Sequence, residues 1–224
     1  MSILCYLVIA LGAYLLGSIP FGFLAAKARG IDIRSVGSGN IGATNAMRVL
    51  GKPMGIGVLL LDVLKGWFAC FLGTFIYCQF ISGIGLHDFP SRDEASTWVE
   101  HLPYAGIVAG IFAVLGHNYT CWLKFRGGKG IATTAGVYVA LAPWPLLIAR
   151  VVFILALLVT RYVSVASISA AIALPATIWI IEPQNVLLGS VTTALGALAI
   201  YKHKSNIQRL LAGTENRFGK TTRT

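Results

Sequence analysis

The stretch that decides the fold is Gly130–Thr160, which reads GIATTAGVYVALAPWPLLIARVVFILALLVT. It is about one and a half times as long as the roughly 20 residues that carry a helix across a bilayer. Pro143 and Pro145 lie in its middle, and proline both breaks a helix and restricts the residue before it. We therefore expect two short membrane spans joined by a tight turn at Pro143-Trp144-Pro145.

The rest of the chain is similarly apolar. Of its 224 residues 56% are hydrophobic and 12% are charged, whereas a soluble domain carries about a quarter charged residues. The apolar runs are continuous rather than alternating, which predicts helices, because lipid leaves no water to satisfy an open backbone. The further spans that we expect are Ile3–Ala26, Met54–Phe80, Leu102–Asn118, Tyr162–Ile181 and Val186–Tyr201.

These runs predict an all-α integral membrane protein with seven transmembrane helices and one domain over residues 1–224. We expect the first run to be retained as a helix, because no basic leader precedes it. With seven spans, fifteen of the eighteen lysines and arginines lie on one side, and five of the eight acidic residues lie on the other. Positive loops stay in the cytoplasm, so the N-terminus is expected outside and the C-terminus inside. A single span over Gly130–Thr160 would export the basic tail.

The net charge of +10 therefore reflects orientation and anionic ligands rather than nucleic acid. The four cysteines form no CxxC pair, so they are expected to be packing thiols and not metal ligands.

The first motif that carries chemistry is a glycine-rich polar loop, Gly37-Ser38-Gly39-Asn40-Ile41-Gly42-Ala43-Thr44-Asn45, followed by Arg48. Its glycines permit positive φ, and successive N–H groups in such a loop form a nest for an anion. A short helix over Thr44–Leu50 would point its N-terminus at a phosphate and carry Arg48 one turn in. The alternative is a flexible polar loop that needs glycine only for its turns.

The second motif is Gly116-His117-Asn118 followed by Lys124-Phe125-Arg126-Gly127-Gly128-Lys129-Gly130. It lacks the GxxxxGK[ST] spacing of a nucleotide-binding loop and the strand before it. A second anion nest with two or three cations is plausible. The alternative is a basic anchor at the membrane surface followed by a turn.

The third motif runs from Tyr201 to Leu211 and continues to Glu215. On a helix His203, Asn206 and either Arg209 or Leu210 share one face. Histidine is the side chain best suited to take a proton near neutral pH. The alternative is an amphipathic helix on the membrane surface. Asp62 and Lys65, one turn apart in a span, favour a structural ion pair that supports the site.

Together these motifs resemble the acyl-phosphate-dependent glycerol-3-phosphate acyltransferases of bacteria, the PlsY family, over nearly the whole chain. The first span resembles the family at Tyr14–Pro20, and Asp62–Gly66 resembles a family segment in the second span. The chain departs from the usual pattern at Thr120, where the family has proline, at Arg126, often lysine, and at Lys202, usually arginine.

The resemblance implies transfer of a fatty acyl group from acyl phosphate to glycerol 3-phosphate, giving 1-acylglycerol 3-phosphate and phosphate. It implies a multi-pass protein of the bacterial inner membrane with its site on the cytoplasmic face, partnered by its two substrates and membrane lipid. A monomer without metal, cofactor or nucleic acid is expected. The main alternative from the residues is a transporter or channel for a phosphorylated anion.

The expected catalytic residues are Ser38, Arg48, Lys129, His203 and Asn206. The expected substrate- and phosphate-binding residues are Gly37, Gly39, Asn40, Gly42, Thr44, Asn45, His117, Gly127, Gly128, Ser164, Arg209 and Glu215. His203 is the leading protein base, and a phosphate oxygen of the substrate is its rival.

Overall fold

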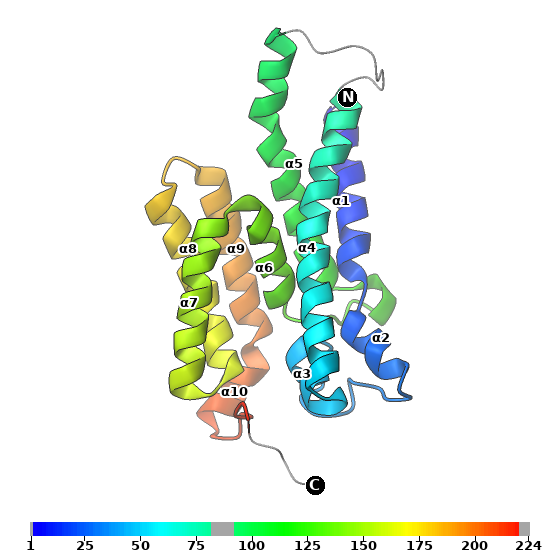
Figure 1. Ribbon diagram of the computed structural model, residues 1–224, viewed down its shortest axis with the longest axis vertical. Coiled ribbons are helices and arrows are strands. Elements are labelled where there is room, and N and C mark those ends of the chain that lie inside the picture. Colours follow the sequence, from blue (N-terminus) through cyan, green and yellow to red (C-terminus); the bar gives the residue numbers. More distant parts are fainter. Residues whose placement is uncertain (1, 82–91, 220–224) are drawn as a thin grey trace. The chain divides into compact units, whose positions relative to one another are not determined.

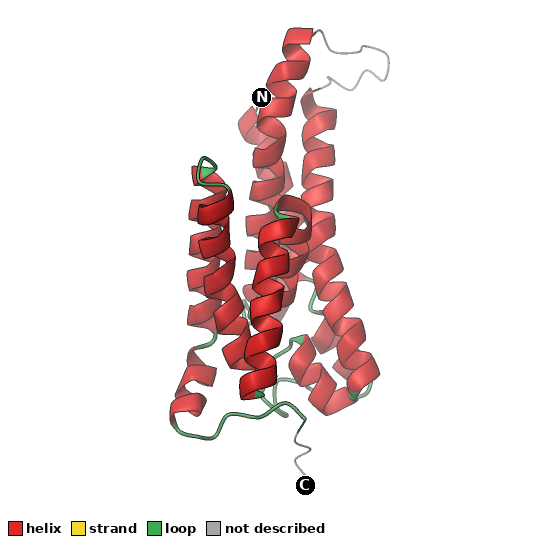
Figure 2. Cartoon of the chain, turned by 60° about the vertical axis from the view of Figure 1, so that its left-hand side comes forward, coloured by secondary structure: helices red, strands yellow, loops and turns green. Residues whose placement is uncertain are grey.

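A computed structural model describes residues 2–81 and 92–219, and within these ranges every regular element is a helix (Figure 2). The chain divides into two compact units, Met1–Leu141 and Ala142–Thr224. The helices, labelled in Figure 1, are α1 (Ser2–Ser18), α2 (Phe21–Lys27), α3 (Ala43–Leu50), α4 (Lys52–Ile81), α5 (Arg92–Asn118), α6 (Ile131–Leu141), α7 (Pro143–Thr160), α8 (Val163–Ile181), α9 (Val186–Lys202) and α10 (Lys204–Leu211), with a 3₁₀ turn at Cys121–Leu123.

Five helical stretches in the described part of the chain are long and apolar enough to cross a membrane, and α9 with α10 would add a sixth. That last pair is bent by 52° at its break. The predicted multi-span helical protein is therefore confirmed. The predicted break inside Gly130–Thr160 is confirmed, because α6 ends at Leu141 and α7 begins at Pro143. The break lies at Ala142, and Pro143-Trp144-Pro145, where we expected the turn, forms the first turn of α7, because proline is tolerated at the start of a helix. α6 has only 11 residues, which is about 16 Å of helix against roughly 30 Å of hydrocarbon.

The first span differs from the continuous helix that we expected over Ile3–Ala26. α1 ends at Ser18 and α2 begins at Phe21. Pro20 lies at the break, where its ring prevents the N–H donation that a continuous helix needs. The break leaves carbonyl groups without helical partners, which is costly in an apolar surrounding.

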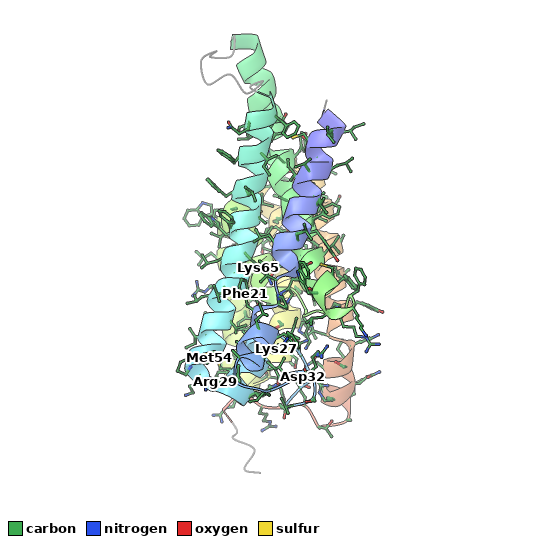
Figure 3. All side chains as sticks on the ribbon, turned by 90° about the vertical axis from the view of Figure 1, so that its right-hand side faces the viewer. Phe21, Lys27, Arg29, Asp32, Met54 and Lys65 are labelled. Carbon is green, nitrogen blue, oxygen red and sulfur yellow. The ribbon has the colours of Figure 1, made fainter. Side chains whose placement is uncertain are left out.

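Two side chains satisfy these carbonyls. The Thr120 hydroxyl donates to the Ser18 carbonyl at 2.6 Å, and Lys65 Nζ donates to the Ile19 carbonyl at 2.9 Å. Figure 3 shows Lys65 beside Phe21 near this break, and Lys65 Nζ lies 5.4 Å from the ring centroid. Thr120, where the resembled family has proline, thus has a specific function in this chain.

Unit 1 is built on close packing of small residues between α1, α4 and α5, and α6 packs against α4. A Cβ at Gly66 of α4 would overlap the Thr133 carbonyl, and one at Gly136 of α6 would overlap the Val63 carbonyl. Such close backbone approach is how helices associate in lipid. It holds the short helix α6 firmly against α4.

The first loop is anchored in the core of unit 1. Ile33 is 0% exposed and Ile41 is 4% exposed, and both pack with Ala26, Ala46 and Val58 from α2, α3 and α4. Fixed at two apolar points, the polar loop between them is ordered. This anchoring argues against the flexible-loop alternative.

Unit 2 packs α7 against α8 and α8 against α9. The segment after α10 folds back along the turn between α7 and α8. The Phe218 N–H donates to the Arg161 carbonyl at 2.7 Å, and Arg217 Nε donates to the Tyr162 hydroxyl at 3.0 Å.

The acidic residue Asp88 and the basic residues Lys220 and Arg223, used in the orientation argument, lie outside the described residues.

Candidate functional site

Asn45 is the centre of the first loop. Its Nδ2 donates to the carbonyls of Val36 at 3.1 Å and Asn40 at 2.9 Å, and also approaches that of Ile33 at 3.2 Å. Its Oδ1 accepts the N–H of Ser38 at 2.8 Å. The side chain is 1% exposed, and a buried amide satisfied on both sides makes its loop rigid. Asn45, expected as a phosphate ligand, holds the loop from inside.

The glycines give this loop its turns. Gly37 and Gly39 have φ of 63° and 70°, the left-handed region that favours glycine. The N–H of Gly39 donates to the Val36 carbonyl, and the N–H of Gly42 donates to Asn40 Oδ1 at 2.8 Å. These two donors and that of Ser38 are used within the loop, so an anion nest here would have to use other amides of the loop.

What the loop can still offer to an anion is its side chains and the start of α3. That helix begins at Ala43, in agreement with the predicted Thr44–Leu50. Its first turn includes the half-exposed Thr44. Its N-cap residue is Gly42, so no side chain caps the start of the helix. Arg48 lies in its last turn and is exposed. Ser38 precedes the helix and is half-buried.

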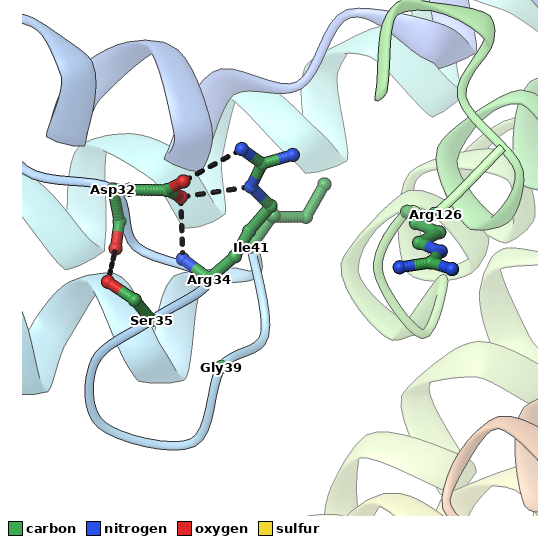
Figure 4. A pocket seen from close by; sticks show the side chains of 7 residues that line it. Asp32, Arg34, Ser35, Gly39, Ile41 and Arg126 are labelled. Atoms are coloured by element: carbon green, nitrogen blue, oxygen red, sulfur yellow. Dashed lines mark hydrogen bonds and ion pairs between the residues drawn. The ribbon is translucent and has the colours of Figure 1, made fainter. Parts of the chain in front are cut away.

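A cavity of about 400 Å³ opens beside this loop, lined by Asp32, Arg34, Ser35, Gly39, Ile41, Arg126 and Gly127 (Figure 4). Sequence reasoning missed Asp32, Arg34, Ser35 and Arg126 as site residues. Asp32 and Arg34 form a bidentate ion pair. Arg34 Nε donates to Asp32 Oδ1 at 2.9 Å, and Arg34 Nη2 donates to Asp32 Oδ2 at 2.7 Å. An acid two residues before an arginine, just ahead of a glycine motif, was the available signal.

The ion pair keeps the carboxylate ionised. Hydrogen bonds from the Arg34 side chain and then from its backbone N–H lower the pKa of Asp32 to about 2. Figure 3 places Asp32 at the same end of unit 1 as Lys27 and Arg29.

The second loop folds against the end of α5. The N–H of Gly127 donates to the Asn118 carbonyl at 3.2 Å, and that of Gly128 donates to the His117 carbonyl at 3.0 Å. A Cβ at Gly128 would overlap the His117 ring, so this position requires glycine. These two amides are bonded to carbonyls, so an anion nest in the second motif would have to use other donors of the loop. Lys129 follows and is half-buried.

His117 belongs to a buried triad with Lys65 and Asp62. Lys65 Nζ lies 2.7 Å from Asp62 Oδ1, 3.0 Å from His117 Nδ1 and 2.9 Å from the Ile19 carbonyl. The contacts of Lys65 Nζ to His117 and to the Ile19 carbonyl have hydrogen-bond geometry, whereas its contact to Asp62 Oδ1 is an ion pair. Because an ammonium only donates, Nδ1 of His117 accepts here. His117, expected as a phosphate ligand, therefore joins the helix break to the glycine loop.

Unit 2 carries the third motif. His203 is 3% exposed, at the junction of α9 and α10, and its Nδ1 lies 2.7 Å from the Ala199 carbonyl. A carbonyl only accepts, so Nδ1 carries the proton and the neutral ring has its lone pair on Nε2. That is the arrangement a general base needs, with one nitrogen oriented by the backbone.

Glu215 orders the residues around His203. It accepts Asn206 Nδ2 on Oε1 and Arg209 Nε on Oε2, each at 2.7 Å. Burial, the largest influence, raises the pKa of this carboxyl, but the hydrogen bonds from Asn206 and Arg209 together outweigh it and hold the pKa below its ordinary value. Gly213, with φ of 68°, makes the turn that brings the carboxylate back.

Ser164 lies near the same carboxylate and also lowers its pKa. Its hydroxyl oxygen is buried but forms no hydrogen bond of good geometry in the described part of the chain. A buried polar group without a good partner is costly, which favours a role with a ligand.

The structure therefore sorts the predicted site residues into two groups. Unit 1 holds the first group: Gly37, Ser38, Gly39, Asn40, Gly42, Thr44, Asn45, Arg48, His117, Gly127, Gly128 and Lys129. Unit 2 holds the second: Ser164, His203, Asn206, Arg209 and Glu215. Within unit 2 Asn206, Arg209 and Glu215 form one hydrogen-bonded cluster.

The fold and these polar clusters define a class, a multi-pass helical membrane protein with ordered, cation-bearing loops beside apolar helices. Comparison with known proteins gives the family. The model of the family described as glycerol-3-phosphate acyltransferase matches residues 7–213.

Relatives with that name match over nearly their whole length. The one from Geotalea daltonii is 42% identical over 95% of this chain and 97% of its own. The one from Thermosynechococcus vestitus is 44% identical over 94% of each chain.

Solved structures agree. The crystal structure of PlsY (YgiH), an integral membrane glycerol 3-phosphate acyltransferase, in its glycerol 3-phosphate form has a TM-score of 0.79 at 38% identity, over 96% of both chains. Its lysophosphatidic acid form has a TM-score of 0.76 at 37% identity, over 96% of this chain and 95% of that one. This chain belongs to the glycerol-3-phosphate acyltransferase family, and the transporter alternative is not favoured.

Proposed function

We propose that this protein transfers a fatty acyl group from acyl phosphate to glycerol 3-phosphate, and so makes lysophosphatidic acid and inorganic phosphate. The family match over residues 7–213 carries the proposal. The choice of acyl phosphate as the donor is supported by the family resemblance. It also fits a direct transfer, in which the enzyme does not need to form a covalent intermediate. The donor is a mixed anhydride whose phosphate is already a good leaving group.

In the proposed reaction a hydroxyl oxygen of glycerol 3-phosphate attacks the acyl carbonyl carbon. The new C–O ester bond forms, the bond from that carbon to the phosphate oxygen breaks, and phosphate leaves with the bonding electron pair. The hydroxyl proton passes to His203 Nε2, whose lone pair the Nδ1 contact with the Ala199 carbonyl supports. A phosphate oxygen of the substrate is the rival base.

The remaining residues position the substrates and neutralise their charge. We assign Arg48 and Lys129 to the phosphate groups, because guanidinium and ammonium groups donate strongly to phosphate oxygens. Ser38, Thr44 and Ser164 supply hydroxyl donors. Asn206, fixed by Glu215, orients the acceptor. We propose residues 1–224 as one acyltransferase domain, and we assign no metal or cofactor to the reaction.

The protein is proposed to lie in the bacterial inner membrane as a monomer, with seven crossings, the N-terminus outside and the catalytic residues on the cytoplasmic face. Charge asymmetry of the loops supports that orientation. α6 would supply the shortest crossing, held by its glycine contacts with α4.

The test uses protein purified in detergent with glycerol 3-phosphate and either palmitoyl phosphate or palmitoyl-CoA. Release of phosphate and formation of lysophosphatidic acid are both followed. Turnover with palmitoyl phosphate alone supports the proposal. Turnover with palmitoyl-CoA equal to that with palmitoyl phosphate would contradict acyl phosphate as the specific donor. The absence of product from folded protein with either donor would refute the proposed activity.

Arg48→Ala and Lys129→Ala test the assigned roles. Each is expected to reduce turnover by at least about a hundredfold, as loss of a charge-stabilising donor does. Arg29→Ala, an exposed cation outside the assigned set, is the control. Near-normal turnover in either test variant removes that residue from the site.

A further inference from the structure

The cavity of about 400 Å³ beside the first loop has no role in the chemistry above. Its lining comes entirely from unit 1 and includes Gly127. Figure 4 shows the first loop on one side of the cavity and Arg126 of the second loop on the other. Its volume lies within the roughly 300–1,000 Å³ of small-molecule sites. Gly39 and Gly127 also line it, and a side chain at Gly127 would overlap the His117 carbonyl, so the second loop can pack this closely only with glycine there.

The charges of the lining do not balance. Asp32 and Arg34 neutralise each other, and Asp32 stays ionised over the physiological range. Their pairing uses Nε and Nη2 of Arg34, which leaves Nη1 of the same guanidinium. Arg126 on the other wall is exposed, and its side chain makes no ion pair or hydrogen bond within the described residues. The cavity therefore has a net charge of one positive.

The donors suit a phosphate group. Guanidinium groups present planar pairs of N–H donors that match phosphate oxygens. The Arg34 guanidinium is held in place by its two contacts to Asp32 and lies 4.9 Å from the Phe23 ring centroid. A preorganised donor costs less entropy when a ligand binds. The side chains of Arg34 and Asp32 are 45% and 46% exposed, so a ligand arrives from water.

We propose that this cavity is a subsite for a free phosphate-bearing anion, separate from Arg48 and Lys129, held between Arg34 and Arg126. The identity of the anion rests on the proposed function. It is the phosphate monoester acceptor before reaction or the inorganic phosphate released after it. Both share the dianionic phosphate that the two guanidinium groups recognise.

Two substitutions change the cavity charge in opposite directions. Arg126→Gln makes it neutral, and Asp32→Asn raises it to two positive charges. The asparagine side chain retains an Oδ1 atom that can accept the Arg34 N–H, so the loop turn is kept. Lys124→Asn is the matched control, because Lys124 is exposed on the same loop, does not line the cavity and has a φ of 53° that asparagine tolerates.

The first measurement is binding of inorganic phosphate to purified protein without acyl donor, by calorimetry at low salt. Arg126→Gln is expected to weaken binding about tenfold, as loss of a charge-assisted hydrogen bond does. Asp32→Asn is expected to strengthen binding several-fold, and Lys124→Asn is expected to match the parent protein. This readout needs no turnover, so it stands even if the proposed acyltransferase reaction fails.

The second measurement is steady-state kinetics with palmitoyl phosphate. If the subsite captures the acceptor, KM for glycerol 3-phosphate follows the same order while kcat stays within about twofold. If it receives the product, only inhibition by phosphate follows that order. Phosphate binding that is the same in all four proteins, or weakened in both cavity variants, overturns the proposal, because structural damage would not produce opposite signs.

Discussion

Two ion pairs of unit 1 have the same length and opposite surroundings. Lys65 and Asp62 lie 2.7 Å apart with side chains 2% and 3% exposed, and Arg34 and Asp32 lie 2.7 Å apart with side chains 45% and 46% exposed. An exposed pair is screened by water and salt, so it contributes little to stability. A buried pair cannot lose one member without leaving a charge in an apolar interior.

The difference assigns the two pairs separate roles. The buried pair joins the α1–α2 break to His117, on which Gly128 packs, so its role is architectural. The exposed pair fixes a guanidinium at the edge of a cavity, so its role is electrostatic. Arg209 and Glu215, 31% and 4% exposed, are intermediate. Distance alone would rank these pairs as equal.

The largest effect is expected for Asp62→Ala. It leaves the Lys65 ammonium buried without its carboxylate, and breaking such a pair costs about 3–5 kcal/mol. Thermal unfolding in detergent, followed by tryptophan fluorescence, is expected to show a large loss of stability or no folded protein. The double variant Asp62→Leu with Lys65→Met removes both charges and is expected to be more stable than Asp62→Ala. A single variant as stable as the parent would contradict the architectural role.

A smaller effect is expected for Asn45→Ala, which removes the centre of the first loop. The Ser38 N–H and the carbonyls of Val36 and Asn40 lose a partner, at a cost of about 2–3 kcal/mol that water partly offsets. Hydrogen exchange should accelerate over residues 36–42 while α4 stays protected. Asn40→Ala, which removes one bond to the Gly42 N–H, is the control. Unchanged exchange in Asn45→Ala would show that the apolar anchors alone order the loop.

Glu215→Gln tests the intermediate pair. The pKa of Glu215 is lowered in the folded protein, so its charge contributes stability above the ordinary value of about 4.5. That contribution is lost as pH falls through the lower folded value. The variant is expected to lose about 1–2 kcal/mol at pH 7 and to approach the parent protein in acid. Melting temperatures from pH 7 to 3 check this, and a constant difference across that range would exclude the ionised carboxylate as the cause.

The smallest effect on stability is expected for Asp32→Asn. The pKa of Asp32 is about 2, so ionisation favours the folded state above its ordinary pKa and this preference disappears as pH falls through about 2. Because the pair is exposed, the melting temperature at pH 7 should barely change. A loss comparable with that of Asp62→Ala would end the distinction between the two pairs.

Much of the architecture could be predicted from the sequence. Continuous apolar runs predicted helices, and Pro143 predicted the turn that separates α6 from α7. The short helix that carries Arg48 was predicted within one residue of its start. These features depend on local backbone chemistry and on the solvent. The three motifs and the family resemblance were likewise visible in the residues, and the family is confirmed.

The partners of each polar group were decided only by tertiary structure. Pro20 is local, but the break it causes persists because Thr120 and Lys65, far along the chain, satisfy the freed carbonyls. Phosphate-binding loops commonly contain residues such as Asn45, Gly127 and Gly128. In this protein the Asn45 side-chain amide and the N–H groups of the two glycines donate to backbone carbonyls instead. A sequence shows which groups can form hydrogen bonds. Which partner each group finds depends on the distant segments whose packing brings donor and acceptor atoms to about 3 Å from each other.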